Sequence, residues 1–120
     1  MLTQINDLPS HVVGFSASGK VDKHDYDTVL IPAVNKLADK TGAINYLFIL
    51  NTDISNFTMG AITDDLKIGL KQFFRWHKIA IVSDQEGVNK FTDMIGTVIH
   101  GEVKSYTKSQ LSEARAWVAA

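Results

Sequence analysis

Two short apolar runs, each bounded by polar residues, constrain the fold of this chain more than any other feature. They are "NYLFIL" at 45–50 and "KIAIV" at 78–82. Apolar runs of this length without polar alternation are typical of strands that are covered on both faces of a sheet. Between and around them, apolar residues recur at helical spacing, so strands alternate with helices. This alternation predicts a mixed α/β domain with right-handed crossovers and a largely parallel sheet.

The first forty residues predict a hairpin followed by a helix. The segments "MLTQI" and "HVVGFSAS" are separated by turn-forming residues, which indicates an antiparallel pair of strands. In "KHDYDTVLIPAVNKLADKTG", apolar residues follow a helical period. We expect Asp22 to cap this helix and Gly42 to end it. Pro32 lies well inside and predicts a kink or a break, which costs about 3 kcal/mol if nothing compensates.

A second amphipathic helix is predicted in "TMGAITDDLKIGLKQFFRW". Its acidic pair, Asp64 and Asp65, is expected on a solvated face, because neighbouring helical positions point about 100° apart and do not form a catalytic dyad. A basic column of Lys67, Lys71 and Arg75 is interpreted as an ordinary solvent face. The apolar stripe, the side that packs in an amphipathic helix, comprises Met59, Ile62, Leu66, Leu70 and Phe73.

The last third of the chain adds a helix, an edge strand and a terminal helix. The third helix is predicted through Val88, Phe91, Met94 and Ile95. "EVKSYT" alternates weakly, as an edge strand does, and Thr107 and Gln110 have capping-box spacing before a final amphipathic helix. The predicted order is ββαβαβαβα, with four or five strands and about four helices in one domain over 1–120.

Composition excludes several function classes. Cysteine is absent, which removes thiol nucleophiles, thiolate zinc sites and disulfides. The formal charge is -1, so no overall field favours nucleic acid. No apolar run approaches the ~20 residues of a membrane span, and we expect a soluble cytoplasmic protein. The four histidines form no metal motif, and no glycine-rich phosphate loop is present, so neither a metal nor a cofactor is predicted.

Candidate binding residues follow the two buried strands. Ligands of parallel sheets usually bind beyond the carboxyl ends of the strands, which indicates Asn51, Thr52, Asp53 and Ser55 after one strand and Ser83, Asp84 and Gln85 after the other. Because Asp at loop-to-helix junctions usually caps the helix, we interpret both aspartates as structural and predict no catalytic residue.

Two hydroxyl groups precede the second helix. Ser55 and Thr58 lie where backbone N–H groups and the helix dipole stabilise an added phosphate, so both are weak candidates for phosphorylation.

Four segments together form a recognisable pattern: "GKVDKHDYDTVLIPAVNKL", "NYLFIL" before a loop with Phe57 and Gly60, "DDLKIGLK" leading to "KIAIVSD", and "SYTKSQLSEARAWV". In combination they resemble the SpoIIAA-like family, small bacterial proteins of the STAS type that are also described as related to Sec14-type lipid-binding folds. The resemblance implies helices packed largely on one side of the sheet and a role in binding. Phosphorylated STAS domains carry an Asp-Ser-Ser-Gly motif where this chain has "NTDISNFTMGAI", so a kinase-controlled switch is not expected.

The preferred prediction is a non-enzymatic STAS-like domain that binds a protein partner or small ligand through the carboxyl-end loops and the helix after "NYLFIL". Phe57 and Met59 join the candidate residues on this basis. The alternative is a Sec14-type carrier or sensor of a lipid or other apolar ligand, and a homodimer stays open. The pocket of such a carrier would be lined by Phe57, Met59, Phe73, Phe74 and Trp76.

Overall fold

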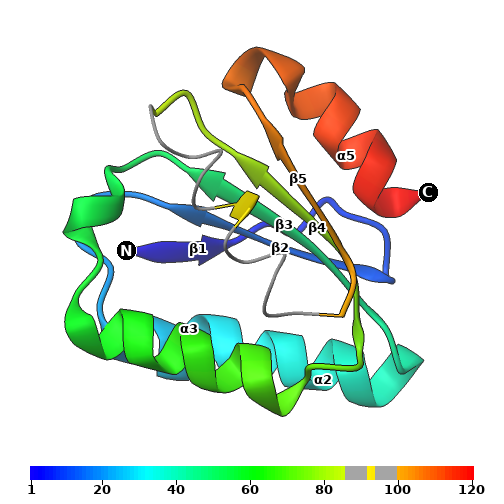
Figure 1. The fold of residues 1–120 in the computed structure, drawn as a ribbon, viewed down its shortest axis with the longest axis horizontal. Helices are drawn as coiled ribbons and strands as arrows, with labels where there is room; N and C mark the ends of the chain where they lie inside the picture. The colour runs from blue at the N-terminus through cyan, green and yellow to red at the C-terminus, as the bar shows by residue number, and fades with distance from the viewer. Residues whose placement is uncertain (86–91, 94–99) are drawn as a thin grey trace.

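The described chain forms a five-stranded sheet in which the strands lie in sequence order, β1-β2-β3-β4-β5 (Figure 1). The structure is a computed structural model that describes residues 1–85, 92–93 and 100–120. β1 is antiparallel to β2 and the remaining pairs are parallel, as the sequence predicted. The strands are β1 (Leu2–Gln4), β2 (Val12–Ala17), β3 (Ile44–Leu50), β4 (Trp76–Val82) and β5 (Glu102–Tyr106).

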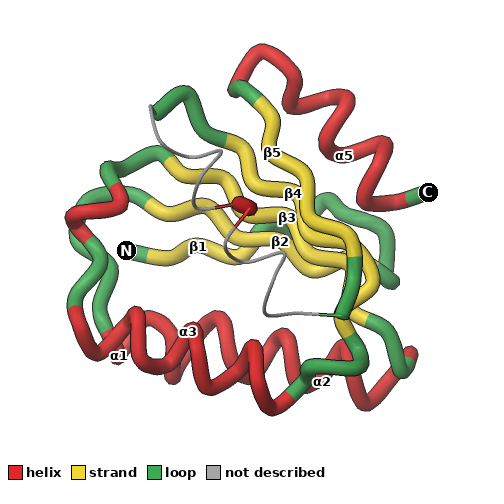
Figure 2. The backbone as a smooth tube through the Cα atoms, in the orientation of Figure 1, coloured by secondary structure: helices red, strands yellow, loops and turns green. Residues whose placement is uncertain are grey.

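Helices cover both faces of this sheet (Figure 2). On one side lie α1 (Lys23–Asp25), the π-helical turn η1 (Tyr26–Leu30), α2 (Ile31–Thr41) and α3 (Met59–Lys71). The opposite side carries α5 (Leu111–Ala119), which follows the 3-10 turn η3 (Lys108–Gln110). The helix predicted through Val88, Phe91, Met94 and Ile95 lies outside the described residues. No helix within the described ranges is long and apolar enough to cross a membrane.

The first helical segment shows how the chain accommodates Pro32. Asp22 caps α1 in a reciprocal capping box with Asp25, and Gly42 ends α2 at φ 76°, both as predicted. In η1 the Ile31 N–H bonds to the Tyr26 carbonyl, five residues back. Pro32 therefore falls in the first turn of α2, where its missing donor is not needed. A π-helical turn thus takes the place of the predicted kink or break.

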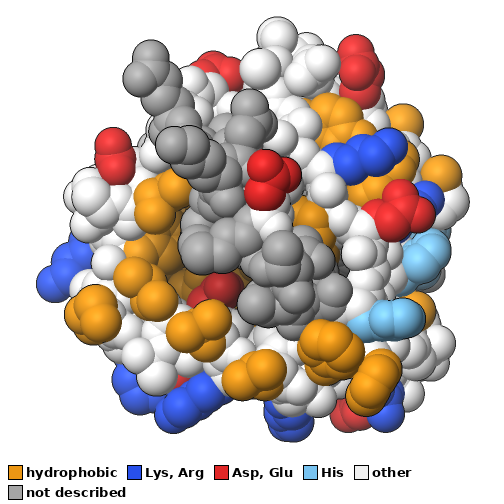
Figure 3. Space-filling view, in the orientation of Figure 1, with side chains coloured by type: hydrophobic (Ala, Val, Ile, Leu, Met, Phe, Trp, Pro, Cys, Tyr) orange, Lys and Arg blue, Asp and Glu red, His pale blue; other side chains and the backbone are white. Residues whose placement is uncertain are grey.

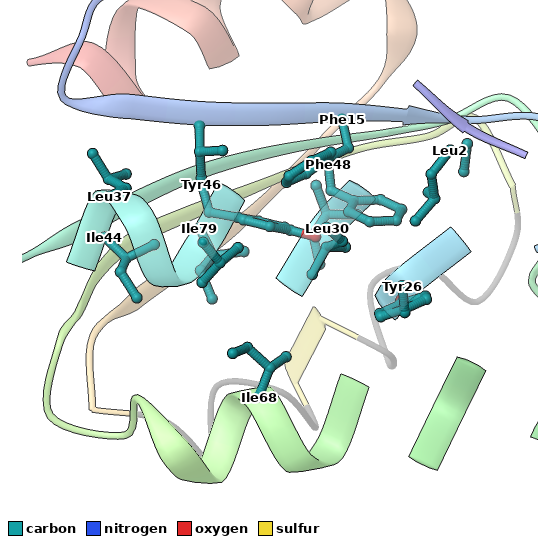
Figure 4. Close-up of a cluster of buried hydrophobic side chains, with 14 of the residues drawn as sticks. Leu2, Phe15, Tyr26, Leu30, Leu37, Ile44, Tyr46, Phe48, Ile68 and Ile79 are labelled. Atoms are coloured by element: carbon teal, nitrogen blue, oxygen red, sulfur yellow. The ribbon is translucent and has the colours of Figure 1, made fainter. Parts of the chain in front are cut away.

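Alternation along β3 explains why its sequence is apolar apart from Asn45. Tyr46 and Phe48 point into a cluster with Phe15 of β2 and Leu30, beneath α2 and α3 (Figure 4). Leu47 points the other way and packs beneath α5. Because helices cover both faces, neither set of side chains meets water, and the strand needs no polar alternation. α3 contributes Ile68 to the larger cluster (Figure 4).

Candidate functional site

The loops after β3 and β4 meet at the carboxyl edge of the sheet, because these strands are parallel neighbours. Asn51 is tied back to β2: its N–H donates to the Ala17 carbonyl, and its side-chain amide donates to the Ser16 hydroxyl at 3.0 Å. The loop then enters the 3-10 turn η2 (Ile54–Asn56), which leads directly into α3. The predicted candidate residues of this loop therefore lie at the end of the sheet from which α3 departs.

Asp53 acts as a cap. Its carboxylate accepts a hydrogen bond from the Ser55 backbone N–H at 2.9 Å, at the start of η2. This bond, together with one from the Ser55 hydroxyl, lowers the pKa of Asp53. A carboxylate held in its charged form by its own turn shapes the loop, which agrees with the structural interpretation made from the sequence.

The loop after β4 is fastened to the start of the last helical segment. The Asp84 carboxylate accepts a hydrogen bond from the Lys108 backbone N–H at 2.8 Å. Ser83 is buried; its N–H donates to the Tyr106 carbonyl, and its hydroxyl oxygen accepts from the Gln85 N–H. Ser83 and Asp84 therefore connect β4, β5 and η3.

Gln85 joins the two loops, a role that sequence reasoning did not assign. Its side-chain oxygen accepts from the Ile54 N–H at 3.1 Å, and its amide nitrogen donates to the Thr52 carbonyl. These backbone groups flank Asp53, so Gln85 holds the loop after β3 against the loop after β4. Strand order placed Gln85 among the candidate residues of this edge, but its partners lie about thirty residues upstream, so the local sequence does not indicate the bridge.

Gln85→Ala is expected to lower the free energy of unfolding by about 1 to 2 kcal/mol, because two backbone groups lose their partner. Gln85→Glu keeps an acceptor for Ile54, but at pH 8 it sets a carboxylate oxygen against the Thr52 carbonyl, so its loss is expected to be at least as large. Urea unfolding of the three proteins measures both values. Equal stability of Gln85→Ala and the natural protein would contradict this role.

A polar hollow of about 360 Å³ opens at the ends of β4 and β5. Its walls carry hydroxyl, amide and carboxyl groups, from Ser83, Asp84, Gln85, Ser105, Tyr106, Thr107 and Gln110. A second, more apolar hollow of about 530 Å³ lies beside α2, where Val12, Pro32 and Leu37 meet Lys36 and Lys40. Across the described ranges, no group of three or more His, Cys, Asp or Glu could hold a metal ion.

The two predicted phosphoacceptors differ in availability. The Thr58 hydroxyl caps α3 by accepting from the Ala61 N–H at 3.2 Å, and the residue is half-buried. Ser55 is exposed on η2, with its hydroxyl bonded to Asp53. The Thr58 hydroxyl is therefore engaged at the start of α3, whereas Ser55 lies outside that helix.

α3 turns its predicted core stripe outward, which corrects the sequence-based assignment. Met59 and Leu70 are 77% and 70% exposed, Leu66 is 57% exposed, and Ile62 is exposed as well. The side facing the core carries Ala61, Asp64 and Ile68 instead. Phe74, just past the helix, is also exposed and contacts Phe73 and His100. We call the exposed set the α3 row: Met59, Ile62, Leu66, Leu70 and Phe74.

The α3 row follows the helix across the surface (Figure 3). Hydrophobic side chains follow one another along α3 across the lower part of this view. Met59 and Leu70 are eleven residues apart, which is three helical turns and about 16 Å. Met1 is the other large apolar side chain found exposed among the described residues. Exposed apolar surface is therefore concentrated on this helix.

Acidic residues on the opposite side hold α3 to the first helical segment, so the predicted solvated pair is in fact engaged. Asp64 is 3% exposed, and its oxygens lie 3.2 and 3.3 Å from the Lys23 ammonium. The Tyr26 hydroxyl donates to Asp65 at 3.0 Å. Burial raises the pKa of Asp65 to about 6, and the bond from Tyr26 opposes this rise.

A small residue signals this orientation. A Cβ added at Gly60 would lie 3.0 Å from the Lys23 Cβ, a tight contact that would push Lys23 back by a few tenths of an ångström. The neighbouring Ala61 is fully buried. "GA" at the start of the helix was thus the local hint that this side packs against another helix.

Comparison with known proteins agrees with this architecture. The SpoIIAA-like family model matches residues 12–119. The chain belongs to the SpoIIAA-like family. A crystal structure at 2.25 Å, of an uncharacterized DUF3478-family protein with a SpoIIAA-like fold from Shewanella loihica PV-4, superposes with a TM-score of 0.73. It covers 98% of this chain and 93% of its own, at 24% identity, which shows a shared fold. No curated protein matches the sequence.

The lining predicted for a carrier pocket is not assembled in this SpoIIAA-like chain. Met59 and Phe74 are exposed, whereas Trp76 is buried against Tyr46, with ring centroids 5.8 Å apart. Phe57 packs on the larger core cluster, 6.2 Å from the Phe48 ring. Neither hollow described above includes any of the five predicted lining residues.

Proposed function

We propose that this SpoIIAA-like chain is a non-enzymatic binding domain that recognises a protein partner through the α3 row. The observation that carries the proposal is the exposure of Met59, Ile62, Leu66 and Leu70 along one side of one helix. Contiguous apolar surface of this kind is unfavourable in water and typical of sites that another molecule covers. STAS-type domains commonly act by binding proteins, which agrees with the family membership.

The carboxyl edge of the sheet supports the proposal as a rigid base for α3. Asp53 and Gln85 fix the loop that enters the helix, and Thr58 caps its first turn. Asn51 and Ser55 are exposed at the start of this surface, and we include them with Phe57 and Met59 among the residues that a partner approaches. A fixed surface loses little conformational freedom on binding.

Absence of catalysis is part of the proposal and follows from how the carboxylates are used. Asp53 and Asp84 accept backbone hydrogen bonds, while Asp64 is paired with Lys23. A general acid or base needs a proton to exchange with a substrate. These groups instead serve the loops and helices that hold them.

Site-specific photo-crosslinking tests the proposal. A photo-reactive phenylalanine placed at Leu66 is expected to give a discrete adduct in cells that express the full chain, because the α3 row is the contact surface. The same probe at Asp39, an exposed position on α2, is expected to give none. The measurement is the pattern of adducts on a denaturing gel, followed by mass spectrometry.

Two double substitutions, each combined with the probe at Leu66, distinguish a specific adduct from non-specific crosslinking. Ile62→Ser with Leu70→Ser, placed beside the probe at Leu66, is expected to remove the adduct, because the row is interrupted on both sides. Lys36→Ser with Lys40→Ser on α2 is expected to leave it. Adducts that are the same at Leu66 and Asp39, or that survive the row substitutions, would overturn the proposal.

A further inference from the structure

We infer that the partner contacts the α3 row with an acidic amphipathic helix, whose Asp or Glu side chains pair with Lys67 and Lys71. This inference rests on the proposed function and names the chemistry of the partner. It follows from the distribution of charge around α3, from the shape of the row, and from the position of its lysines.

The carboxylates of α3 contact neighbouring helical segments, whereas its lysines are exposed. The helix carries two acids and two lysines, and both acids are engaged toward α1 and η1. Lys67 and Lys71 are exposed, and neither has an ion pair with any residue that the structure describes. Although the chain has a net charge of -1, the outward side of α3 therefore presents apolar and positive groups with the Thr63 hydroxyl, while both carboxylates of the helix are engaged elsewhere. A complementary surface is apolar and negative.

The row is narrow, and its lysines lie on one flank. Lys67 and Lys71 are four residues apart, so they form one column beside Leu66 and Leu70. The opposite flank carries Gly69 and the engaged Asp65. A helix partner matches this arrangement, because an apolar seam with charges along one border is how paired helices fix their register and partner. Helices that lie in a membrane surface instead spread Lys and Arg across the polar face.

A second copy of the chain is a poorer occupant. In a two-fold antiparallel pairing of α3 with its copy, the same flank of both helices faces the same side. Lys67 and Lys71 would then meet the lysines of the other copy, and like charges repel. The charge pattern thus disfavours self-association and favours a partner that supplies carboxylates.

Two synthetic peptides test the inference against the full chain. Both have about 18 residues and the same leucine and isoleucine seam, and they differ only in flanking positions, Glu in one and Lys in the other. The acidic peptide is expected to bind about fivefold or more tightly by fluorescence anisotropy at low salt, with the difference shrinking as salt rises. Lys67→Glu with Lys71→Glu is expected to reverse the order.

The matched control is the exposed lysine pair on α2, which has the same spacing. Lys36→Glu with Lys40→Glu makes the same change in net charge and is expected to keep the preference for the acidic peptide. Equal affinity for both peptides, preference for the basic one, or binding of neither would overturn the inference. None of these results depends on the crosslinking at Leu66, so the proposed function can stand when the acidic helix fails.

Two further measurements test whether a second copy of the chain or a lipid surface covers the α3 row instead. Dimerisation of the chain alone that Leu66→Ser abolishes, seen in sedimentation equilibrium, would replace the acidic helix with a second copy. Row-dependent binding to phosphatidylcholine vesicles containing phosphatidylglycerol, unaffected by the acidic peptide, would replace it with a lipid surface. We expect neither behaviour.

Discussion

Ile68→Ala is expected to lower the free energy of unfolding by about 3 kcal/mol, whereas Leu66→Ala is expected to change it by less than about 0.5 kcal/mol. The two residues lie two positions apart on α3. Ile68 is 4% exposed within the larger core cluster, while Leu66 is 57% exposed in the α3 row. Truncating Ile68 leaves a cavity, but truncating Leu66 only removes surface that water already reaches. Urea denaturation of both variants measures the difference.

This comparison checks the orientation of α3, on which the proposed function depends. Both variants introduce alanine at neighbouring positions of one helix, and Ile and Leu have similar helix propensities, so propensity alone cannot explain a large difference. If Leu66→Ala destabilised the protein as much as Ile68→Ala, Leu66 would belong to the core. The α3 row would then not be an exposed surface.

The sequence predicted a helix in "TMGAITDDLKIGLKQFFRW", within which α3 spans Met59–Lys71, but it assigned the wrong side of that helix to the core. Hydrophobic periodicity finds the widest apolar stripe, and Met59, Ile62, Leu66 and Leu70 make that stripe in α3. The choice of the buried side depended on distant partners. Lys23, about forty residues upstream, supplies the charge that lets Asp64 be buried. Apart from the small residues Gly60 and Ala61, the local pattern does not indicate which side is buried.

The carboxyl edge of the sheet could be predicted in outline, because its position depends on strand order and not on distant side-chain partners. Strand order alone places Asp53 and Asp84 in neighbouring loops, because β3 and β4 are parallel and adjacent. Their use as acceptors for backbone N–H groups follows from the general behaviour of Asp at turns. The bridge made by Gln85 could not be predicted, since it requires the two loops to have packed to within hydrogen-bond distance.

Asp65 is expected to make the natural protein less stable as the pH rises from about 4 to about 7. Its folded pKa is about 6, above the ordinary value of 3.8. Between these values the folded protein holds a proton that the unfolded chain has released, so raising the pH favours unfolding. Below pH 4 both states are protonated and the contribution is fully present. The shift of about two pKa units corresponds to about 2 to 3 kcal/mol.

Asp65→Asn isolates this effect. The amide keeps an acceptor for the Tyr26 hydroxyl but has no proton to lose, so the variant is expected to gain about 2 to 3 kcal/mol relative to the natural protein between pH 4 and pH 7. Carboxylates with lowered pKa, such as Asp22 and Asp53, act in the opposite direction but are present in both proteins and cancel. Asp39→Asn, at an exposed position on α2, is the matched control for the substitution itself. Parallel profiles for Asp65→Asn and the natural protein would show that Asp65 ionises without cost, and that Tyr26 does not hold α3 through a protonated carboxyl group.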